Sequence, residues 1–275
     1  MHDVLYFGLE PERRRLHKEI IDALTCTEPA TLVMERWVRI VTYQYGNAPL
    51  SAAGSLHGYG GRFNLGLDVD ASSLNPWPAL YIAQDYETAF REKFVLPSDE
   101  LTQGLTPQEL ALEHGVSHST VFVHGTFTRL FDVREMISLT ALARVLGRIK
   151  LPARAEKLKK KLQIPANSLF MINTPLRIHE SVAKHNWRLW PAQFGLPAPS
   201  HILSNLVRQA GFEGIIYRSS KAPGDCVAIF PDQLASASFV ELSDPAPDGV
   251  KHVRLDESSA SELEGWESVV PSMRP

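Results

Sequence analysis

Residues Glu213 to Phe230 read EGIIYRSSKAPGDCVAIF, and this stretch decides the fold class. Two runs rich in β-branched and aromatic residues, EGIIYRSS and CVAIF, are typical of strands. Between them, KAPGD contains the proline and glycine that favour a turn, so the stretch predicts two strands joined by a turn. Just before it, residues 204–210 have helical spacing and end at Gly211, a natural residue to follow a helix.

Working outward, STVFVHGTFTRLFDV (119–133) alternates like a strand, and residues 80–83 predict a short strand. A helix is expected from about Tyr86, with Asp85 as its N-cap. Strands and helices both occur, but without the regular alternation of a doubly wound sheet, so an α+β fold with a mixed β core is favoured. Further helices are expected at residues 12–24, 31–41 (TLVMERWVRIV) and 138–163.

The composition is that of a globular protein: among 275 residues, 44% are hydrophobic and 21% charged. The net charge is only −3, so no overall field favours nucleic acid or anionic lipid. No run is long and apolar enough to span a bilayer, and the N-terminal residues do not resemble a signal peptide, so we expect a cytoplasmic protein. Two cysteines are too few for a disulfide framework or a cysteine metal site.

Three other patterns suggest chemistry but fit poorly. Residues 106–121 have the small residue, the glycine and the valine of a helix-turn-helix, but its second helix would run through the β-branched stretch TVFVHGTF. His114 and His118 are four residues apart, but Gly115 interrupts the helix that a metal site would need. The basic run RAEKLKKKLQ has the charge pattern of a solvated helix face. We therefore expect neither nucleic-acid binding nor a metal.

The stretch His57 to Gly66, HGYGGRFNLG, places Arg62 inside a glycine cluster. Glycines permit positive φ and close approach to the main chain, and a guanidinium binds phosphate through its planar fork of donors. One interpretation is a loop that presents Arg62 to a phosphate-bearing small molecule. The alternative is an ordinary turn whose arginine pairs with a surface carboxylate.

Taken together and in order, three segments resemble the signatures of the RES domain family, named for its arginine, glutamate and serine. They are GGRFN (60–64), PALYIAQDYETAFREKF (78–94) and GFEGIIYRSS (211–220). ERWVRI (35–40) resembles the usual opening of the domain. The resemblance implies an α+β fold similar to diphtheria-toxin-like ADP-ribosyltransferases and an activity that degrades NAD+. It also implies a toxin with a cognate antitoxin or immunity protein, and NAD+ as substrate with no further cofactor.

The resemblance assigns roles to individual residues. Glu92 would stabilise the charge that develops at the ribose, Arg62 would hold the pyrophosphate, and Ser219 would bond to ribose or phosphate. Tyr81 would offer a face to the nicotinamide ring. Arg39, Arg62, Asn64, Tyr81 and Ser219 would together bind NAD+. Glu87 competes with Glu92 as the motif acid, but its place in the first turn of a helix is already explained by the helix dipole.

The sequence divides into a helical N-terminal extension (1–34), a RES-like catalytic domain with a helical insertion (35–240), and a C-terminal tail (241–275). The tail is rich in Asp, Glu, Ser and Pro, and we expect it to be loosely packed. The resemblance favours an NAD+ glycohydrolase or phosphorylase. A protein ADP-ribosyltransferase using the same site remains an alternative, and the helix-turn-helix at 106–121 is an alternative of another class.

Overall fold

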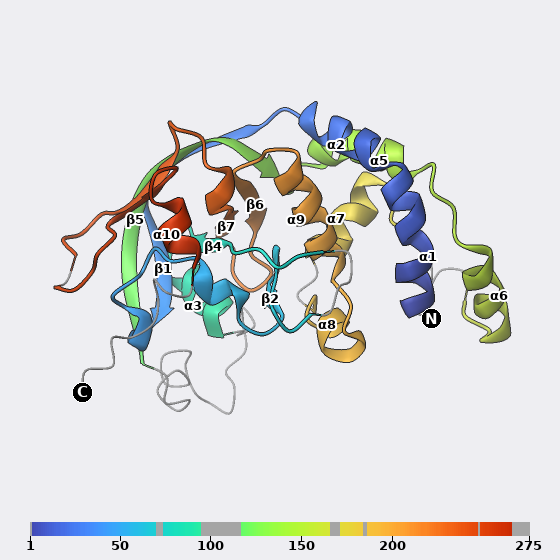
Figure 1. The fold of residues 1–275 in the computed structure, drawn as a ribbon, viewed down its shortest axis with the longest axis horizontal. Helices are drawn as coiled ribbons and strands as arrows, with labels where there is room; N and C mark the ends of the chain where they lie inside the picture. Colours follow the sequence, from blue (N-terminus) through green and yellow to red (C-terminus); the bar gives the residue numbers. More distant parts are fainter. Residues whose placement is uncertain are drawn as a thin grey trace.

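The hairpin predicted from residues 213–230 lies inside a seven-stranded sheet (Figure 1). The computed structural model describes residues 2–69, 74–94, 117–165, 171–183, 186–246 and 248–265. β6 (Gly214–Arg218) and β7 (Asp225–Ile229) pair antiparallel, with Gly214 opposite Ile229 and Arg218 opposite Asp225. The strand order is β1-β4-β7-β6-β5-β8-β9, and β1 also pairs with β5. Five strands therefore close on one another, and the predicted α+β class is confirmed.

The sheet separates two apolar cores because side chains alternate along its strands. Ile215 and Tyr217 of β6 enter one core, together with Phe63 and Phe230. Ile216 between them enters the other core, which is shared with Val227. The hairpin is buried on both faces, so its register is fixed by packing.

Residues 31–41 form a strand and not the helix that their spacing predicts. β1 (Ala30–Thr42) runs antiparallel to β5 (His118–Asp132), with Val38 opposite Phe122. A register shift between Met34 and Trp37 inserts a bulge into this pairing. The bulge changes which residues face the cores, so buried Met34, Val38 and Val41 fall at helical spacing although the chain is extended.

β4 (Leu80–Ala83) and α3 (Tyr86–Phe94) confirm the strand and helix predicted for this segment. β4 lies between β1 and β7 in the sheet. The predicted N-cap is also present, because the backbone N–H of Thr88 donates to Asp85 Oδ1 over 2.8 Å. This cap sets the direction in which α3 leaves the strand.

Most of the described helices gather in the half of the molecule away from the strands, whereas α3 lies beside β1 and β4 (Figure 1). The predicted helix at 204–210 is part of a longer one that ends just before Gly211, whose φ is +79°. The predicted helical region 138–163 divides into α5 and α6. The helices are α1 (His2–Arg15), α2 (His17–Thr25), α5 (Thr140–Leu146), α6 (Ala153–Lys161), α7 (Pro175–Ala183), α8 (Leu189–Phe194) and α9 (Pro199–Gln209).

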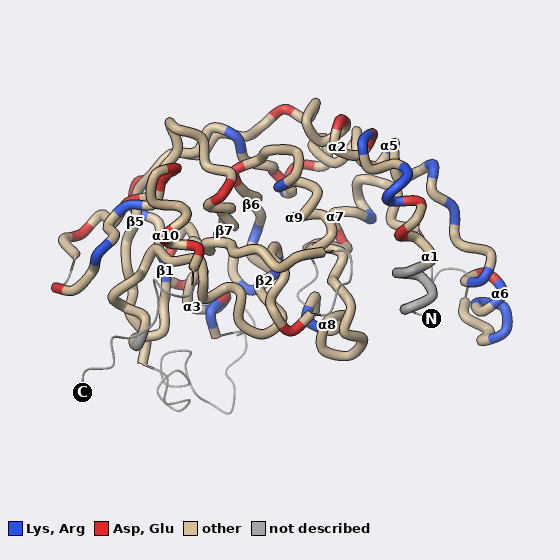
Figure 2. Tube along the Cα trace, in the orientation of Figure 1, with Lys and Arg blue, Asp and Glu red and all other residues tan. Residues whose placement is uncertain are grey.

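The basic run of α6 lies on a solvated helix, as predicted. Only Ala155 of this helix is buried, and Figure 2 shows its lysines and arginines at the end of the molecule farthest from the sheet. No helix of the described part of the chain has the length and apolar character needed to cross a membrane.

The expectation of a loosely packed segment after Glu241 is wrong for residues 241–246 and 248–265. β8 (Phe239–Leu242) pairs with β5, β9 (Arg254–Asp256) pairs with β8, and α10 (Ala260–Glu264) follows. Leu255 and Leu263 are fully buried in the second core. This segment has few apolar residues, and they are far apart in sequence. Its composition therefore does not reveal that they pack into the same core.

Short elements complete the fold and carry part of the site. The glycine loop, residues 57–66, contains the two-residue strands β2 and β3, which pair with each other. These elements are η1 (Tyr43–Tyr45), η2 (Ala53–Leu56), β2 (Gly60–Gly61), β3 (Asn64–Leu65), η3 (Met136–Leu139) and η4 (Pro231–Gln233).

Candidate active site

A cleft of about 510 Å³ opens where β1, β4, α3, the glycine loop and the end of the hairpin meet. Arg62, Tyr81 and Glu92 line it together, although Arg62 and Glu92 are 30 positions apart in sequence. A volume of this size falls within the range of small-molecule and cofactor sites. The structure therefore brings three of the four residues of the predicted set into one cavity, and the fourth, Ser219, touches it through Glu92.

Glu92 is held at both carboxylate oxygens by the turn between β6 and β7. Ser219 Oγ donates to Glu92 Oε1 over 2.7 Å, and Lys221 Nζ lies 3.7 Å from Oε2. The side chain of Lys221 is only 8% exposed and that of Glu92 21% exposed. Burial lowers the pKa of Lys221, and the carboxylate of Glu92 opposes that effect. The pair fixes the carboxylate at the wall of the cleft.

Ser219 acts through Glu92 in this arrangement. Its hydroxyl oxygen accepts hydrogen bonds from the backbone N–H groups of Lys221 and Ala222, at 3.0 and 3.2 Å. With the bond that it donates to Glu92, the donor and both lone pairs of the hydroxyl are used. The Ser219 hydroxyl therefore has no hydrogen-bonding capacity left in this structure for the predicted contact with ribose or phosphate.

Gly224 explains why the turn can reach Glu92. A Cβ at this position would lie 2.3 Å from Thr88 Oγ1 and 2.6 Å from Asp85 Oδ2. Only a glycine lets the turn pack against the first turn of α3. Glu92 follows Thr88 by four residues on the same helix, which is about one helical turn, so a local contact at the cap aligns the site.

Arg62 is more buried than the sequence suggests. It is 5% exposed, Nη1 donates to the carbonyl oxygen of Ala183 over 2.8 Å, and Nη2 donates to Ser220 Oγ over 2.7 Å. Its guanidinium carbon lies 5.7 Å from the centre of the Tyr217 ring. The side chain thus joins the glycine loop to α7 and to the β6–β7 turn, rather than pairing with a surface carboxylate.

The glycine cluster is needed for tight packing around the site. Gly60 has a φ of +88°, and a Cβ there would lie 2.3 Å from the carbonyl oxygen of Asn64. At Gly61, a Cβ would lie 2.4 Å from the hydroxyl oxygen of Tyr81. The loop therefore approaches Tyr81 more closely than any other residue type would permit.

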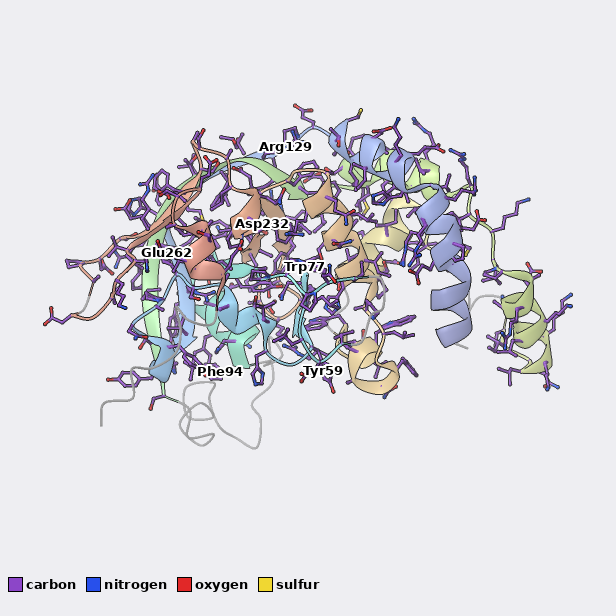
Figure 3. All side chains as sticks on the ribbon, in the orientation of Figure 1. Tyr59, Trp77, Phe94, Arg129, Asp232 and Glu262 are labelled. Atoms are coloured by element: carbon purple, nitrogen blue, oxygen red, sulfur yellow. The ribbon has the colours of Figure 1, made fainter. Side chains whose placement is uncertain are left out.

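Tyr81 and Asn64 form a network behind the cleft. The Tyr81 hydroxyl donates to Asn64 Oδ1 and accepts from the backbone N–H of Phe63, both over 2.9 Å. Asn64 is fully buried, accepts a second bond from the N–H of Gly61, and donates to the carbonyl oxygens of Ser55 and Trp77. Trp77 lies near the middle of the molecule (Figure 3). Burial raises the pKa of Tyr81, which keeps the hydroxyl neutral.

The predicted contact between Asn64 and NAD+ is therefore not available in this structure. All four hydrogen bonds of its amide are made inside the protein. Arg39 does line the cleft, but three of its N–H groups donate to the carbonyl oxygens of Pro49, Ser51 and Tyr81, at 2.7 to 2.9 Å. Burial lowers the pKa of Arg39 to about 10. Both residues hold the walls of the site.

Glu87, the competing acid, points away from this chemistry. Its side chain is 63% exposed and pairs with Arg91 on the same helix over 2.9 Å. It does not line the cleft. The choice of Glu92 as the motif acid thus agrees with the position of each carboxylate.

Sequence reasoning missed three cations of the cleft, Lys93, Lys221 and Arg188. Lys221 is not recognised as a site residue from sequence because KAPGD, which begins with it, is typical of a turn. Its position two residues after Ser219, on a turn that follows a motif strand, was a usable signal. Arg188 lies in a segment where no periodicity or turn pattern pointed to a site.

The remaining alternatives find no support in the described part of the chain. No group of three or more His, Cys, Asp or Glu residues there could hold a metal ion. Of the helix-turn-helix segment, residues 106–116 lie outside the described residues, whereas His118 onward is strand β5, so its second helix does not form. His114 also lies outside them.

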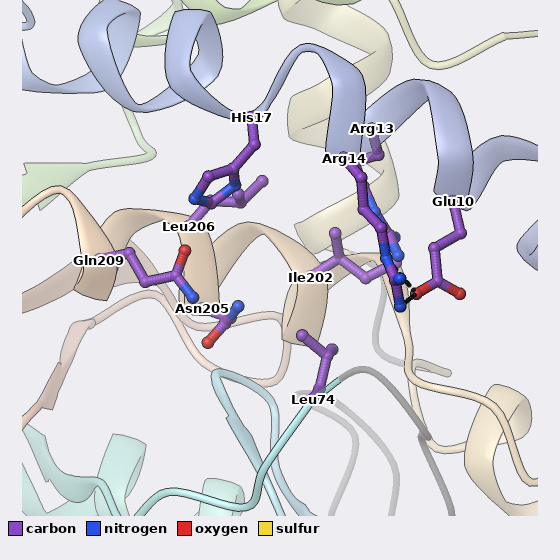
Figure 4. Close-up of a pocket in the computed structure, with 9 residues that line it drawn as sticks. All are labelled: Glu10, Arg13, Arg14, His17, Leu74, Ile202, Asn205, Leu206 and Gln209. Carbon is purple, nitrogen blue, oxygen red and sulfur yellow. Dashed lines mark hydrogen bonds and ion pairs between the residues drawn. The ribbon is translucent and has the colours of Figure 1, made fainter.

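A second, smaller cavity of about 110 Å³ lies between the N-terminal helices and α9 (Figure 4). Arg14 and Glu10 at its edge are joined by hydrogen bonds of 2.6 and 3.1 Å. His17 and Asn205 face it from opposite helices. It is too small for a dinucleotide.

Comparisons with known proteins identify the family of the chain. No curated protein matches the sequence. A chain from the crystal structure of the M. tuberculosis MbcT–MbcA toxin–antitoxin complex is similar at 10% identity and a TM-score of 0.47, over 90% of this chain and 97% of that chain. The model of the RES domain matches residues 36–253, which is most of the chain and includes every residue of the cleft. The chain belongs to the RES domain family.

Proposed function

We propose that the protein is an NAD+-consuming toxin that cleaves the bond between nicotinamide and ribose. Membership of the RES family supports this, because RES toxins are in general enzymes that degrade NAD+. The observation that carries the proposal is the position of Glu92. It is the single carboxylate among the described residues that line a cleft otherwise rich in cations.

One carboxylate is enough for the bond that must break. As the bond between C1′ and the ring nitrogen lengthens, the electron pair moves to the nitrogen and positive charge develops on the ribose, as in glycoside hydrolysis. A fixed carboxylate beside that carbon stabilises the transition state. Nicotinamide leaves as a neutral base, so no acid is required to protonate it. Water or phosphate then adds to C1′ and, in the case of water, releases a proton.

The charges of the cleft suit a dinucleotide. Five cations line it, namely Arg39, Arg62, Lys93, Arg188 and Lys221. The pyrophosphate of NAD+ carries two negative charges, whereas the nicotinamide ring is positive. A cationic wall for the phosphates and one carboxylate for the ribose and the ring match this distribution. The ring of Tyr81 supplies an aromatic face suited to the cationic nicotinamide.

A cognate antitoxin or immunity protein belongs to the same proposal, as does action inside the cell. An enzyme that consumes NAD+ deprives every dehydrogenase of its cofactor, so a cell that makes it needs a protein that blocks the cleft. The acceptor is proposed to be water or phosphate. Transfer of ADP-ribose to a protein is the alternative that the experiment below separates.

Product analysis tests the proposal directly. Purified protein is incubated with NAD+, with and without phosphate, and the products are separated by chromatography. Free nicotinamide with ADP-ribose indicates hydrolysis, and ADP-ribose 1″-phosphate indicates phosphorolysis. Expression without a partner should arrest growth and lower cellular NAD+. Absence of free nicotinamide, even with cell lysate as a source of acceptors, would overturn the enzymatic proposal, and normal growth with folded protein would overturn the toxin role.

A further inference from the structure

Arg188 is the cation of the cleft that has no polar partner in the described structure. It precedes α8 and lines the cleft beside Trp187. No hydrogen bond or ion pair joins its guanidinium to the described residues, and its side chain is exposed to solvent. Its charge is nevertheless close enough to Tyr81, Glu92 and Arg62 for each to influence its pKa, which partial desolvation by the walls of the cleft lowers. A guanidinium is therefore available at the cleft with its donors unused.

The other four cations of the cleft are engaged within the protein. Lys221 pairs with Glu92, and Arg62 donates to Ala183 and Ser220. Arg39 donates to three carbonyl oxygens, and Lys93 Nζ lies 3.4 Å from Thr42 Oγ1. A phosphate that contacted one of these would share the cation with bonds that hold the cleft walls. Arg188 differs from the other four because none of its five N–H donors is used by the described residues.

The side chain of Arg188 is also held in place by the buried aromatic ring of Trp187. Its guanidinium carbon lies 4.5 Å from the centre of the Trp187 ring. Trp187 is 5% exposed and packs edge-on against His201, with ring centres 5.2 Å apart. The Nε2 atom of His201 is in turn 2.9 Å from the carbonyl oxygen of Gly61. The stack thus ties Arg188 to the glycine loop, so its charge is held at the cleft rather than free on the surface.

We propose that Arg188 is the residue that binds the pyrophosphate of the dinucleotide, and that Arg62 is a positioning residue. Arg62 fixes the glycine loop against α7 and the β6–β7 turn, which holds Glu92. This inference rests on the proposed function, because it names the group that recognises the phosphates of that substrate. It differs from the expectation drawn from the sequence, which gave the pyrophosphate to Arg62.

Binding of ADP tests the assignment without turnover, because ADP carries the diphosphate but has no bond to cleave. The dissociation constant is measured by calorimetry for the wild type, Arg188→Gln and Arg188→Lys. Loss of a charged hydrogen bond predicts a Kd for ADP about 10- to 100-fold weaker in Arg188→Gln. Arg188→Lys keeps the charge but lacks the planar fork of donors, so its Kd for ADP should lie between those of the wild type and Arg188→Gln. Adenosine, which lacks phosphate, should bind equally to all three.

Arg36→Gln is the matched control. Arg36 is also an exposed arginine stacked on an aromatic ring, 4.1 Å from the centre of Phe122, but it does not line the cleft. Its substitution should leave the Kd for ADP within about twofold of the wild type. Thermal melting confirms that each variant is folded. Arg188 is exposed and has no hydrogen bond to lose, so its variants should melt near the wild type.

Turnover separates binding from positioning. In Arg188→Gln the KM for NAD+ should rise by about the same factor as the Kd for ADP, with kcat changed less than about threefold, because the phosphates are charged throughout the reaction. Arg62→Gln should instead lower kcat and the melting temperature together. Unchanged ADP affinity in Arg188→Gln would overturn the assignment of Arg188 while leaving the proposed function intact. Failure of the wild type to release nicotinamide, with ADP binding still dependent on Arg188, would overturn the proposed function alone.

Discussion

Replacing Glu92 by glutamine tests the chemistry with little change in structure. The amide has nearly the same size as the carboxylate, and its oxygen can still accept the hydrogen bond that Ser219 Oγ donates over 2.7 Å. The change removes the negative charge that faces Lys221 at 3.7 Å. It therefore isolates the electrostatic role of the carboxylate from its shape.

The magnitudes favour a loss of catalysis over a loss of folding. A preorganised charge that stabilises a developing cation is worth on the order of 10² to 10³ in kcat. The stability cost is that of leaving Lys221, 8% exposed, without its counter-ion, while Glu92 itself is 21% exposed. We estimate this cost at about 1 to 2 kcal/mol, which is well below the free energy of unfolding of an ordinary domain. The variant should fold and bind ligand but turn over slowly.

The assay combines initial rates of nicotinamide release at saturating NAD+, calorimetry with ADP, and thermal melting. Glu92→Gln should lower kcat at least about 100-fold and leave the Kd for ADP within about twofold, because ADP lacks the nicotinamide ribose on which the proposed role of Glu92 acts. Glu87→Gln is the control on the same helix, since its exposed pair with Arg91 contributes a few tenths of a kcal/mol. A Glu92→Gln enzyme within about tenfold of the wild type, or an inactive but folded Glu87→Gln enzyme, would refute the reasoning.

Two further predictions concern the frame of the site. Asn64→Ala leaves the Gly61 N–H, the O–H donor of Tyr81 and two carbonyl oxygens without these partners, so urea titration should show the free energy of unfolding lowered by about 3 kcal/mol. A large loss of ADP affinity in the folded variant would instead indicate direct ligand contact. Burial lowers the pKa of His201 to about 4 from the ordinary 6.5, so the unfolded chain binds more protons between these values. The contribution of His201 to the free energy of unfolding should be complete above pH 6.5 and should fall by about 1 kcal/mol per pH unit toward pH 4. A His201→Gln protein that loses stability over this window as steeply as the wild type would contradict this prediction.

Local signals in the sequence predicted the hairpin and the β4–α3 unit, and they placed Glu92 rather than Glu87 at the cleft. The turn in KAPGD and the cap at Asp85 depend on residues close in sequence, and the structure has both. The spacing between Tyr81 and Glu92 spans one strand and one helix, so both side chains reach the same cleft. Such features can be recognised from sequence because the interactions that create them are local.

Long-range packing decided the rest. The sequence of β1 predicts a helix because a bulge gives its buried residues helical spacing, and only the pairing with β5 reveals the strand. The residues after Glu241 looked loosely packed because Leu255 and Leu263 reach their core only in the folded chain. In the same way, the burial of Arg62, the pairing of Lys221 with Glu92 and the free guanidinium of Arg188 depend on segments more than 90 residues apart in sequence. No local propensity encodes which of several arginines becomes buried and which stays exposed, because that choice is made by the neighbours that tertiary structure supplies.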